Sequence, residues 1–417
     1  MGAGTNYSIN YANGSFTVNP APLDITANNQ SKIYGNVFTF AGTEFTTGSG
    51  QLKNGDTVSS ITLMSGGAAA TATVTAPGPT YAINASAAVF TPAGAGGNYS
   101  ITYHSGTLTV TVRSLDITAN NRSKTYGATV TFAGTEFTTG AGQLVNGDSV
   151  TSVTLSSAGA AATATVTAPG PTYTINISAA VFSPVGKGGN YSVTYHTGTL
   201  TVNPAMLTIT ATSVTKVFGA TYTPNTTTPP RDFTISGLLN SDTVTSITLT
   251  CPGYASSALP GSPYTVTPSA ALGSGLGNYT ISYVNGQLTI GYGTCTGPNP
   301  GGVILPPINT DGSSVWKVGS TVPVKFTVCG ADGQPIADPT AVFASGYGSI
   351  TLINTVRGTV NNINETTYND IPDSAFRWSG GQWIFNMATG NLQKNTTYTF
   401  RIALKNGDFV YFTAGTK

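Results

Sequence analysis

The sequence predicts an all-β protein made of tandem antiparallel modules, of β-sandwich (Ig-like) or open-barrel type, arranged as an elongated rod. A block of about 92 residues occurs three times. Each copy contains short stretches of alternating apolar and polar residues, separated by Gly, Pro and Asn. No segment has a convincing helical period of 3.6. A repeat of this length fits small domains that each close a core of their own.

The three copies contain the same sequence blocks in the same order. Residues 23–110 read LDITANNQSKIYG…NYSITYHSGTLTV, residues 115–202 repeat them almost letter for letter, and residues 207–290 are a divergent copy. Short junctions, two of them containing proline, connect the copies and favour a stiff arrangement. The predicted domains are an orphan hairpin (1–20), three repeats (21–112, 113–204 and 205–292) and a C-terminal β-module (293–417).

Residues 6–18, NYSINYANGSFTV, are predicted to form a β-hairpin. Tyr7, Ile9 and Tyr11 alternate with polar residues, Asn13-Gly14 suits a type I′ turn, and Phe16 and Val18 resume the alternation. The same hairpin is expected to close each copy, over 99–110, 191–202 and 279–290. Because a lone hairpin is marginal in water, the first one is expected to pack on the next repeat or on a neighbouring molecule. The start of the chain has no recognisable signal peptide, and residues 4–18 resemble the end of a further copy.

Further strands are predicted within each module. In the first copy they cover 23–27, 37–40, 58–63, 70–74, 81–83 and 88–90, where Val, Ile, Thr and aromatic residues suit a pleated surface. The C-terminal module is expected to contain strands at 321–328 and 382–386, and a hairpin of 398–404 with 409–412.

The composition excludes several classes of function. Charged residues make up only 7% of the chain, against about 25% in an average soluble protein, and the net charge is +1. Without a basic stripe, nucleic acid is not an expected partner. No apolar run approaches the roughly 20 residues that span a bilayer, so no membrane-spanning segment is predicted. Thr-, Gly- and Asn-rich β-modules with few charges suit a secreted or cell-surface protein.

Charged residues recur at three positions in each copy. A lysine is followed by two acids, and two interpretations remain open. The first is a structural ion pair plus a turn aspartate. The second is an intramolecular isopeptide bond, which needs a desolvated amine beside a protonated acid. The candidate residues are Lys32, Glu44 and Asp56, then Lys124, Glu136 and Asp148, then Lys216, Asp232 and Asp242.

The three cysteines are Cys251, Cys295 and Cys329, so one is unpaired within a monomer. Cys295 and Cys329 are the candidate disulfide, and three free thiols are the alternative. The C-terminal module is also rich in aromatic residues, which could form a sugar-stacking platform or belong to the core and cross-strand pairs. These residues are Trp316, Trp378, Trp383, Tyr398 and Tyr411.

Enzyme machinery is scarce. The two histidines, His104 and His196, occupy the same predicted turn, where the third copy has Val284. No Ser-His-Asp arrangement, HExxH, P-loop or dinucleotide loop is present, and no DxDxD run suggests calcium. The chain is therefore predicted to be non-enzymatic, with no catalytic residues, cofactor or metal.

The repeats resemble MBG domains of bacterial surface proteins through the blocks LDITANNQSKIYG, LKNGDTV and NYSITYHSGTLTV. The C-terminal segment resembles a PxKF-type module through residues 316–326 (WKVGSTVPVKF), 376–378 and 382–386. These resemblances imply an extracellular structural or adhesive role. The leading hypothesis is a stalk, or a subunit of a cell-surface fibre that assembles head-to-tail with copies of itself through the N-terminal hairpin. The alternative is an adhesin whose C-terminal aromatic module contacts a host or matrix glycan or protein.

Overall fold

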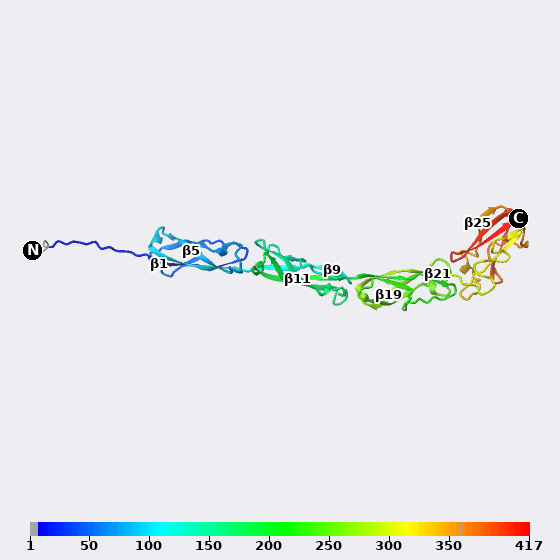
Figure 1. Ribbon diagram of the computed structural model, residues 1–417, viewed down its shortest axis with the longest axis horizontal. Coiled ribbons are helices and arrows are strands. Elements are labelled where there is room, and N and C mark those ends of the chain that lie inside the picture. Colours follow the sequence, from blue (N-terminus) through cyan, green and yellow to red (C-terminus); the bar gives the residue numbers. More distant parts are fainter. Residues whose placement is uncertain (1–6, 228, 359) are drawn as a thin grey trace. The chain divides into compact units, whose positions relative to one another are not determined.

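The computed structural model describes residues 7–227, 229–358 and 360–417, and Figure 1 shows that strands dominate it. Two compact units, Met1–Asn203 and Pro204–Lys417, are described separately below. Apart from short 3₁₀ segments, the helical structure described is one four-residue helix, α1 (Pro339–Val342). Within the described residues, the helices lack the length and apolar character that crossing a bilayer requires. The predicted all-β fold class is confirmed.

The first repeat contains two sheets that enclose one core. Their strand orders are β3-β1-β6 and β2-β7-β5-β4. Alternation places Leu23, Ile25, Ile83 and Leu108 inward, where each is at most 1% exposed. The strands are β1 (Ala21–Ala27), β2 (Gln30–Ile33), β3 (Phe45–Thr47), β4 (Thr57–Met64), β5 (Thr80–Thr91), β6 (Tyr99–His104) and β7 (Gly106–Thr111).

The second and third repeats have the same strand order, with sheets β10-β8-β13 and β11-β12-β14-β9, then β17-β15-β20 and β16-β21-β19-β18. The second repeat comprises β8 (Arg113–Ala119), β9 (Arg122–Thr125), β10 (Phe137–Thr139), β11 (Ser149–Ser156), β12 (Thr172–Ser183), β13 (Tyr191–His196) and β14 (Gly198–Asn203). The third comprises β15 (Ala205–Ala211), β16 (Val214–Val217), β17 (Phe233–Ser236), β18 (Thr243–Thr250), β19 (Tyr264–Ser274), β20 (Tyr279–Val284) and β21 (Gly286–Gly291).

The predicted closing hairpins over 99–110, 191–202 and 279–290 are wrong. β6 pairs with β1 in a parallel register, whereas β7 pairs with β2 and β5 in the other sheet. Gly106 marks this crossing and not a turn, because its φ is not left-handed and a Cβ there would lie 2.4 Å from the carbonyl oxygen of Ala27. Gly198 and Gly286 meet the same backbone restriction. The glycine that suggested a turn is needed for close approach of two backbones.

The predicted N-terminal hairpin is also not formed. Residues 7–20 carry no strand, and residues 1–6 lie outside the described part of the chain. The apolar side chains of the predicted hairpin are exposed to solvent: Tyr7, Ile9, Tyr11, Phe16 and Val18. Strands predicted at 37–40 and 70–74 are likewise irregular loops, and those at 81–83 and 88–90 are parts of the single strand β5. Alternation alone cannot tell a strand from a loop that buries alternate side chains.

The C-terminal module is a second type of β-sandwich, with sheets β22-β24-β27-β26 and β23-β29-β28-β25. Its core contains Trp316, Phe326, Phe343 and Trp383, each at most 1% exposed. The strands are β22 (Ile304–Leu305), β23 (Val315–Trp316), β24 (Thr321–Phe326), β25 (Ile350–Arg357), β26 (Arg377–Ser379), β27 (Gln382–Ala388), β28 (Thr396–Ala403) and β29 (Phe409–Thr416).

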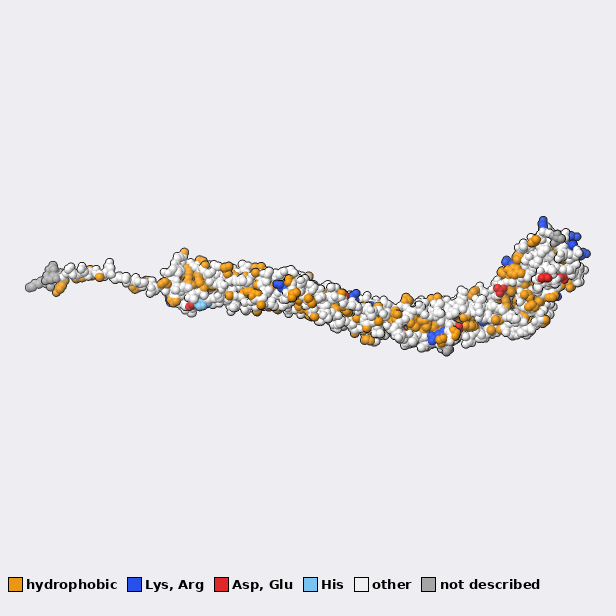
Figure 2. All heavy atoms as spheres, in the orientation of Figure 1, with side chains coloured by type: hydrophobic (Ala, Val, Ile, Leu, Met, Phe, Trp, Pro, Cys, Tyr) orange, Lys and Arg blue, Asp and Glu red, His pale blue; other side chains and the backbone are white. Residues whose placement is uncertain are grey.

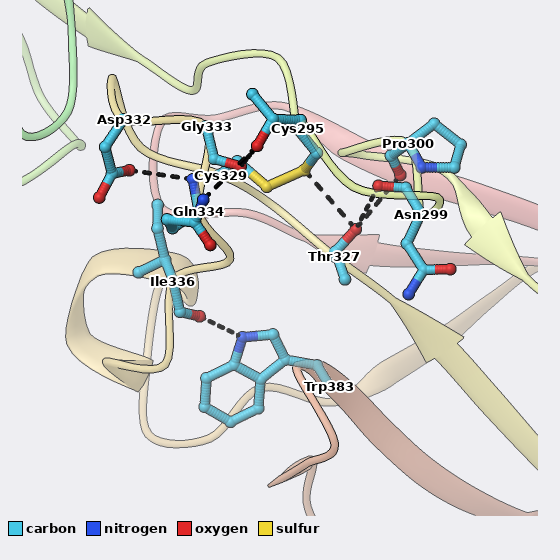
Figure 3. The surroundings of a disulfide bond; sticks show 11 residues. Cys295, Asn299, Pro300, Thr327, Cys329, Asp332, Gly333, Gln334, Ile336 and Trp383 are labelled. Carbon is cyan, nitrogen blue, oxygen red and sulfur yellow. Dashed lines mark hydrogen bonds between the residues drawn. A yellow bond between two sulfur atoms is a disulfide. The ribbon is translucent and has the colours of Figure 1, made fainter.

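A disulfide fastens the start of this module to its first long strand. Cys295 and Cys329 are bonded, with their Cα atoms 5.2 Å apart, and Cys251 is a free thiol. Figure 3 shows the Thr327 hydroxyl beside the bridge and the Trp383 indole donating to the carbonyl of Ile336, at 3.0 Å. The bridge therefore joins the segment after β21 to the polypeptide that leaves β24.

Candidate functional site: a joint between repeats

The turn that follows β2 projects from the end of the first repeat. We call residues Tyr34, Gly35 and Asn36 the tip. The Tyr34 N–H donates to Thr111 at 2.9 Å, and the Asn36 N–H donates back to Ile33 at 3.1 Å. Gly35 has φ +88°, a left-handed conformation that glycine adopts without steric cost. The tip is thus a tight turn held at the end of a strand.

The recurring lysines support these turns from inside. Lys32 is 7% exposed, and its Nζ donates to the carbonyl oxygens of Asn36, at 2.8 Å, and Ala69. Lys124 donates to Ala128 and Ala161, and Lys216 to Ala220 and Ala255. Burial lowers the pKa of all three amines. Backbone carbonyls surround each ammonium, so these lysines organise the loops that flank the tip.

The recurring acids accept hydrogen bonds from backbone N–H groups and tyrosine hydroxyls. Glu44 and Glu136 each accept three backbone N–H groups of their own loops. Asp232 accepts the Tyr222 hydroxyl at 2.8 Å. Asp56, Asp148 and Asp242 each accept a tyrosine hydroxyl from the start of β6, β13 or β20. The ion pairs found in the described chain do not involve Lys32, Lys124 or Lys216. The predicted structural ion pair of lysine with acid is therefore not formed in the described chain, and the isopeptide bond stays a prediction.

Asp148 belongs to a recess at the end of the second repeat that faces the first repeat. We call this recess, formed by Val145, Asn146, Asp148, Asn190 and Tyr191, the socket. Two left-handed residues, Asn146 and Gly147, turn the chain so that the Asp148 N–H returns to the carbonyl of Val145 at 2.9 Å. The Tyr191 hydroxyl donates to Asp148 Oδ2 at 2.9 Å. Burial is the main cause that raises the pKa of Tyr191 to about 12.

The tip of the first repeat fills the socket of the second. Tyr34 is fully buried, and its hydroxyl donates to Asp148 Oδ2 at 2.9 Å. Its ring meets the Tyr191 ring edge-on, with centroids 5.6 Å apart. Tyr34 belongs to the same apolar cluster as Leu115 and Leu200 of the second repeat. The ring of Tyr34 therefore packs into the core of the second repeat, and a buried hydrogen bond joins the first repeat to the second.

Further polar contacts surround Tyr34. The Val74 N–H donates to Asn190 Oδ1 at 2.8 Å, and Asn146 Nδ2 donates to the carbonyl of Ala70 at 3.0 Å. Arg113, at the start of β8, donates from Nη1 to the carbonyl of Tyr34 and from Nε to that of Gln143. Backbone groups of the first repeat are thus paired by side chains of the second, which fixes their relative orientation.

Two glycines make the close approach possible. A Cβ on Gly35 would lie 2.6 Å from Val145 Cγ2, and one on Gly189 would lie 2.5 Å from Thr75 Cγ2. Gly35 is therefore required twice, for its φ and for the space beside Val145.

The third repeat presents a related tip, Phe218-Gly219, to the C-terminal module. The Ala331 N–H donates to the Phe218 carbonyl at 2.8 Å, and the Phe218 ring packs against the core of that module. The Tyr292 hydroxyl donates to the carbonyl of Ala341 at 2.8 Å. An aromatic-glycine tip thus contacts the following module in a second place.

The aromatic residues of the C-terminal module do not form one exposed platform. Trp316, Trp383 and Tyr398 are core residues, Trp378 is half-buried, and Tyr411 is 55% exposed. Tyr411 and its neighbour Phe409 border a hollow of about 630 Å³, together with Tyr292, Asn406 and Asp408.

The histidines lie beside carboxylates. His104 contacts Asp24 at 2.8 Å, His196 contacts Asp116 at 2.9 Å, and all four side chains are about half exposed. A nearby glutamine donates to each aspartate. In the described residues, no group of three or more His, Cys, Asp or Glu side chains converges as metal ligands would.

Sequence reasoning missed the residues that build the joint. Tyr34 and Tyr191 were not singled out, although an aromatic-glycine pair follows the lysine in each copy and an Asn-Tyr pair opens each of β6, β13 and β20. An aromatic residue at a strand end is normally expected in the core of its own domain. Its sequence therefore does not indicate that it packs against the next domain.

Comparisons with known proteins identify the repeats. A family model, "MBG domain (YGX type)", matches residues 23–109, 115–201 and 207–289. No curated protein matches the sequence. Similar solved structures include an I-band fragment of titin, with 9% identity over 73% of this chain and 96% of that chain, and a TM-score of 0.19.

Others are the N-terminal eight Ig domains of Down Syndrome Cell Adhesion Molecule (12% identity, 82% and 40% coverage, TM-score 0.19) and Protocadherin Gamma B2 cadherin domains 3–6 (10% identity, 82% and 84% coverage, TM-score 0.18). The likeness to these structures is weak. The predicted resemblance of the repeats is confirmed, whereas the PxKF-type resemblance of residues 293–417 stays a prediction. The chain belongs to the MBG family, with three tandem domains of the YGX type.

Proposed function

We propose that this protein is a non-enzymatic structural protein of the cell surface, in which the MBG repeats act as a stalk. Tandem MBG domains suggest a surface or adhesin-type protein. The observation that carries the proposal is the joint, where Tyr34 of one repeat is fully buried in the socket of the next. A joint that buries an aromatic ring and pairs backbone groups resists bending between domains.

The surface of the chain supports a passive role. Figure 2 shows few charged side chains on the visible face of the repeats. Hydroxyl and amide groups take their place, in keeping with the 7% of charged residues in the whole chain. Such a surface exerts little long-range electrostatic steering on charged partners.

The stiffness of the joint can be measured directly. Spin labels at Met64→Cys and Val185→Cys, two exposed positions on the first and second repeats, would report one distance in a Cys251→Ala background. We expect a single narrow distribution, which broadens when Tyr34→Ala empties the socket. Tyr11→Ala, at an exposed residue, is the matched control and should leave the distribution narrow. A broad distribution in the unaltered joint would contradict the stalk.

The surface location needs a separate test. Antibodies or protease added to intact cells of the source organism should reach the chain without lysis. Detection only after lysis would overturn the proposed location while leaving the mechanics of the joint untouched.

The fibre version of the proposal uses residues 7–18. They carry the pattern of β6 and β7, but each described repeat already contains both of these strands. Head-to-tail assembly of copies would therefore require residues 7–18 to displace those strands in another molecule, as in a domain swap. Deleting residues 2–18 should then abolish fibres seen by negative-stain microscopy. Unchanged fibres would exclude this route.

An adhesin is the second candidate function. The observation that favours it is the 630 Å³ hollow, where exposed Tyr411 lies 5.9 Å from Phe409 between ring centroids, beside Asn406 and Asp408. Aromatic faces with adjacent polar groups suit a sugar ring. A glycan array with the full chain should show binding that Tyr411→Ala removes. Tyr347→Ala, also at a 55% exposed tyrosine, is the control, and equal loss in both variants would argue against this site.

A further inference from the structure

The first repeat carries a second copy of the socket. Asp56 and Tyr99 correspond to Asp148 and Tyr191 of the occupied socket. The Tyr99 hydroxyl donates to Asp56 Oδ2 at 2.9 Å, the same distance as in the occupied socket. The Lys53 N–H donates to the Tyr99 hydroxyl at 2.8 Å, where the Val145 N–H donates to Tyr191 at 3.1 Å. The walls of the two sockets are therefore built alike.

The two sockets differ in what fills them. Asn190 and Asp148 are 0% and 7% exposed, because the first repeat covers them with its tip and with Val74. The corresponding Asn98 is exposed and Asp56 is half-buried. In the first repeat these residues border an open hollow of about 370 Å³, which is also lined by Asn54, Gly97 and residues 18–21.

We infer that this hollow is a docking site for the aromatic-glycine tip of another MBG domain. In the occupied socket, Asp148 accepts a tyrosine hydroxyl and Asn190 accepts a backbone N–H. Asp56 and Asn98 offer the same acceptors. Gly97 has no heavy atom within 4 Å of a Cβ position, so it leaves the space that Thr75 occupies beside Gly189.

Residues 7–18 identify the occupant. Aligned with 99–110, they place Tyr7, Gly14 and Val18 where the first repeat has Tyr99, Gly106 and Val110. Val110 is 1% exposed in the joint, whereas Val18 is 78% exposed. The occupant is thus an MBG domain joined to the socket as the first repeat is joined to the second, and residues 7–18 carry the sequence pattern of the last two strands of such a domain.

One wall residue differs between the two sockets. Lys53 replaces Val145, and its Nζ donates to the carbonyl of Gly50 at 2.7 Å. The alkyl stem of a lysine can cover apolar surface while its ammonium stays in water, so the substitution preserves a wall for the incoming glycine. The inference is independent of the proposed surface role, because the joint is a property of the repeats wherever the chain resides.

Hydrogen–deuterium exchange on an extended chain tests the inference. A complete extra copy of residues 21–112 replaces residues 1–20, so that its tip precedes the native socket. We expect exchange at 53–56 and 97–99 to slow by about tenfold or more, as burial of a joint would cause. The same chain with Tyr34→Ala in the added copy alone is the control and should exchange as fast as the native protein. Equal exchange in all three chains would overturn the inference.

A second variant guards against misfolding of the added copy. Asp56→Asn should cancel the protection in the extended chain, yet change the exchange of the native chain little, because its socket is open. Asp148→Asn should speed exchange at 145–148 in both chains, which shows that the method detects a lost joint. A further variant of the extended chain combines Asp56→Asn with Tyr34→Ala in the added copy. If residues 53–56 and 97–99 still exchange slowly in that variant, docking at this socket is refuted.

Discussion

The hydroxyl of Tyr34 donates a 2.9 Å hydrogen bond to Asp148, a residue 114 positions further along the chain. This bond connects two domains that each close a core of their own. A buried hydroxyl paired with a carboxylate is expensive to leave unpaired, so the contact favours one relative orientation of the repeats.

Removing the Tyr34 hydroxyl should weaken the joint without emptying it. For Tyr34→Phe we expect a loss of about 1.5–3 kcal/mol in the free energy of unfolding, the usual contribution of a hydrogen bond to a charged group. Urea unfolding followed by circular dichroism measures it. Tyr11→Phe, at an exposed tyrosine, should be neutral, and a neutral Tyr34→Phe would show that the ring alone holds the joint.

Gly106→Ala should destabilise the first repeat by more than about 1 kcal/mol, because the new Cβ would meet the Ala27 carbonyl oxygen at 2.4 Å. Gly14→Ala is the matched control, since Gly14 has the same place in the repeat pattern and no atom within 4 Å. Thermal unfolding of both variants is the measurement. Equal effects would mean that residues 7–18 are packed in solution as β6 and β7 are.

Lys32→Met should lower the free energy of unfolding by about 1–3 kcal/mol. It removes the Lys32 donor from the Asn36 carbonyl and one of two donors from the Ala69 carbonyl, which also accepts the Ala72 N–H. The exposed Lys394→Met serves as control and should be neutral. Intact-mass measurement of the native protein should show only the loss of the two hydrogen atoms that the disulfide accounts for, and no loss of water or ammonia. A deficit of that kind would restore the isopeptide hypothesis for the lysines.

Reduction of the Cys295–Cys329 bridge should lower the unfolding free energy of the C-terminal module by about 2–4 kcal/mol, in line with a loop of 34 residues. Scanning calorimetry with and without reductant tests this. Under denaturing conditions one thiol, that of Cys251, should react with an alkylating agent before reduction and three after it. Three reactive thiols from the outset would contradict the bridge.

Alkaline pH should loosen the joint through Tyr191. Burial raises the pKa of Tyr191 to about 12, above the value of about 10 for an exposed tyrosine. The folded state therefore favours the neutral phenol, and this stabilisation, complete below about pH 10, is lost as the pH rises towards 12. The difference in unfolding free energy between the native chain and Tyr191→Phe should shrink over that range. A constant difference would show that Tyr191 does not titrate in this way.

The all-β fold, the MBG family and the positions of several core strands could be predicted from the repeat pattern alone. Leu23 and Ile25 alternate with polar residues, and a period of two leaves a strand one inner face. A local pattern of this kind can be recognised in the sequence even when the partner strands are not known.

Which strand pairs with which was decided by the tertiary structure. The sequence around Gly106 suits a hairpin turn, yet the chain crosses there from one sheet to the other. Likewise, Lys32 and Glu44 recur together in the sequence but point to different backbone groups. Alternation reports which side chains are buried and says nothing about which backbone lies alongside.

The joint between the first and second repeats could not be predicted from the sequence. Tyr34 carries no mark that separates a tyrosine buried in its own domain from one buried in the next, and Asp148 sits in a segment that reads as a simple turn. Periodicity acts over neighbouring residues, whereas a contact across 114 positions depends on how two finished domains meet end to end. The sequence therefore predicts the repeats, whereas the joint between the first two depends on how their folded ends pack against each other.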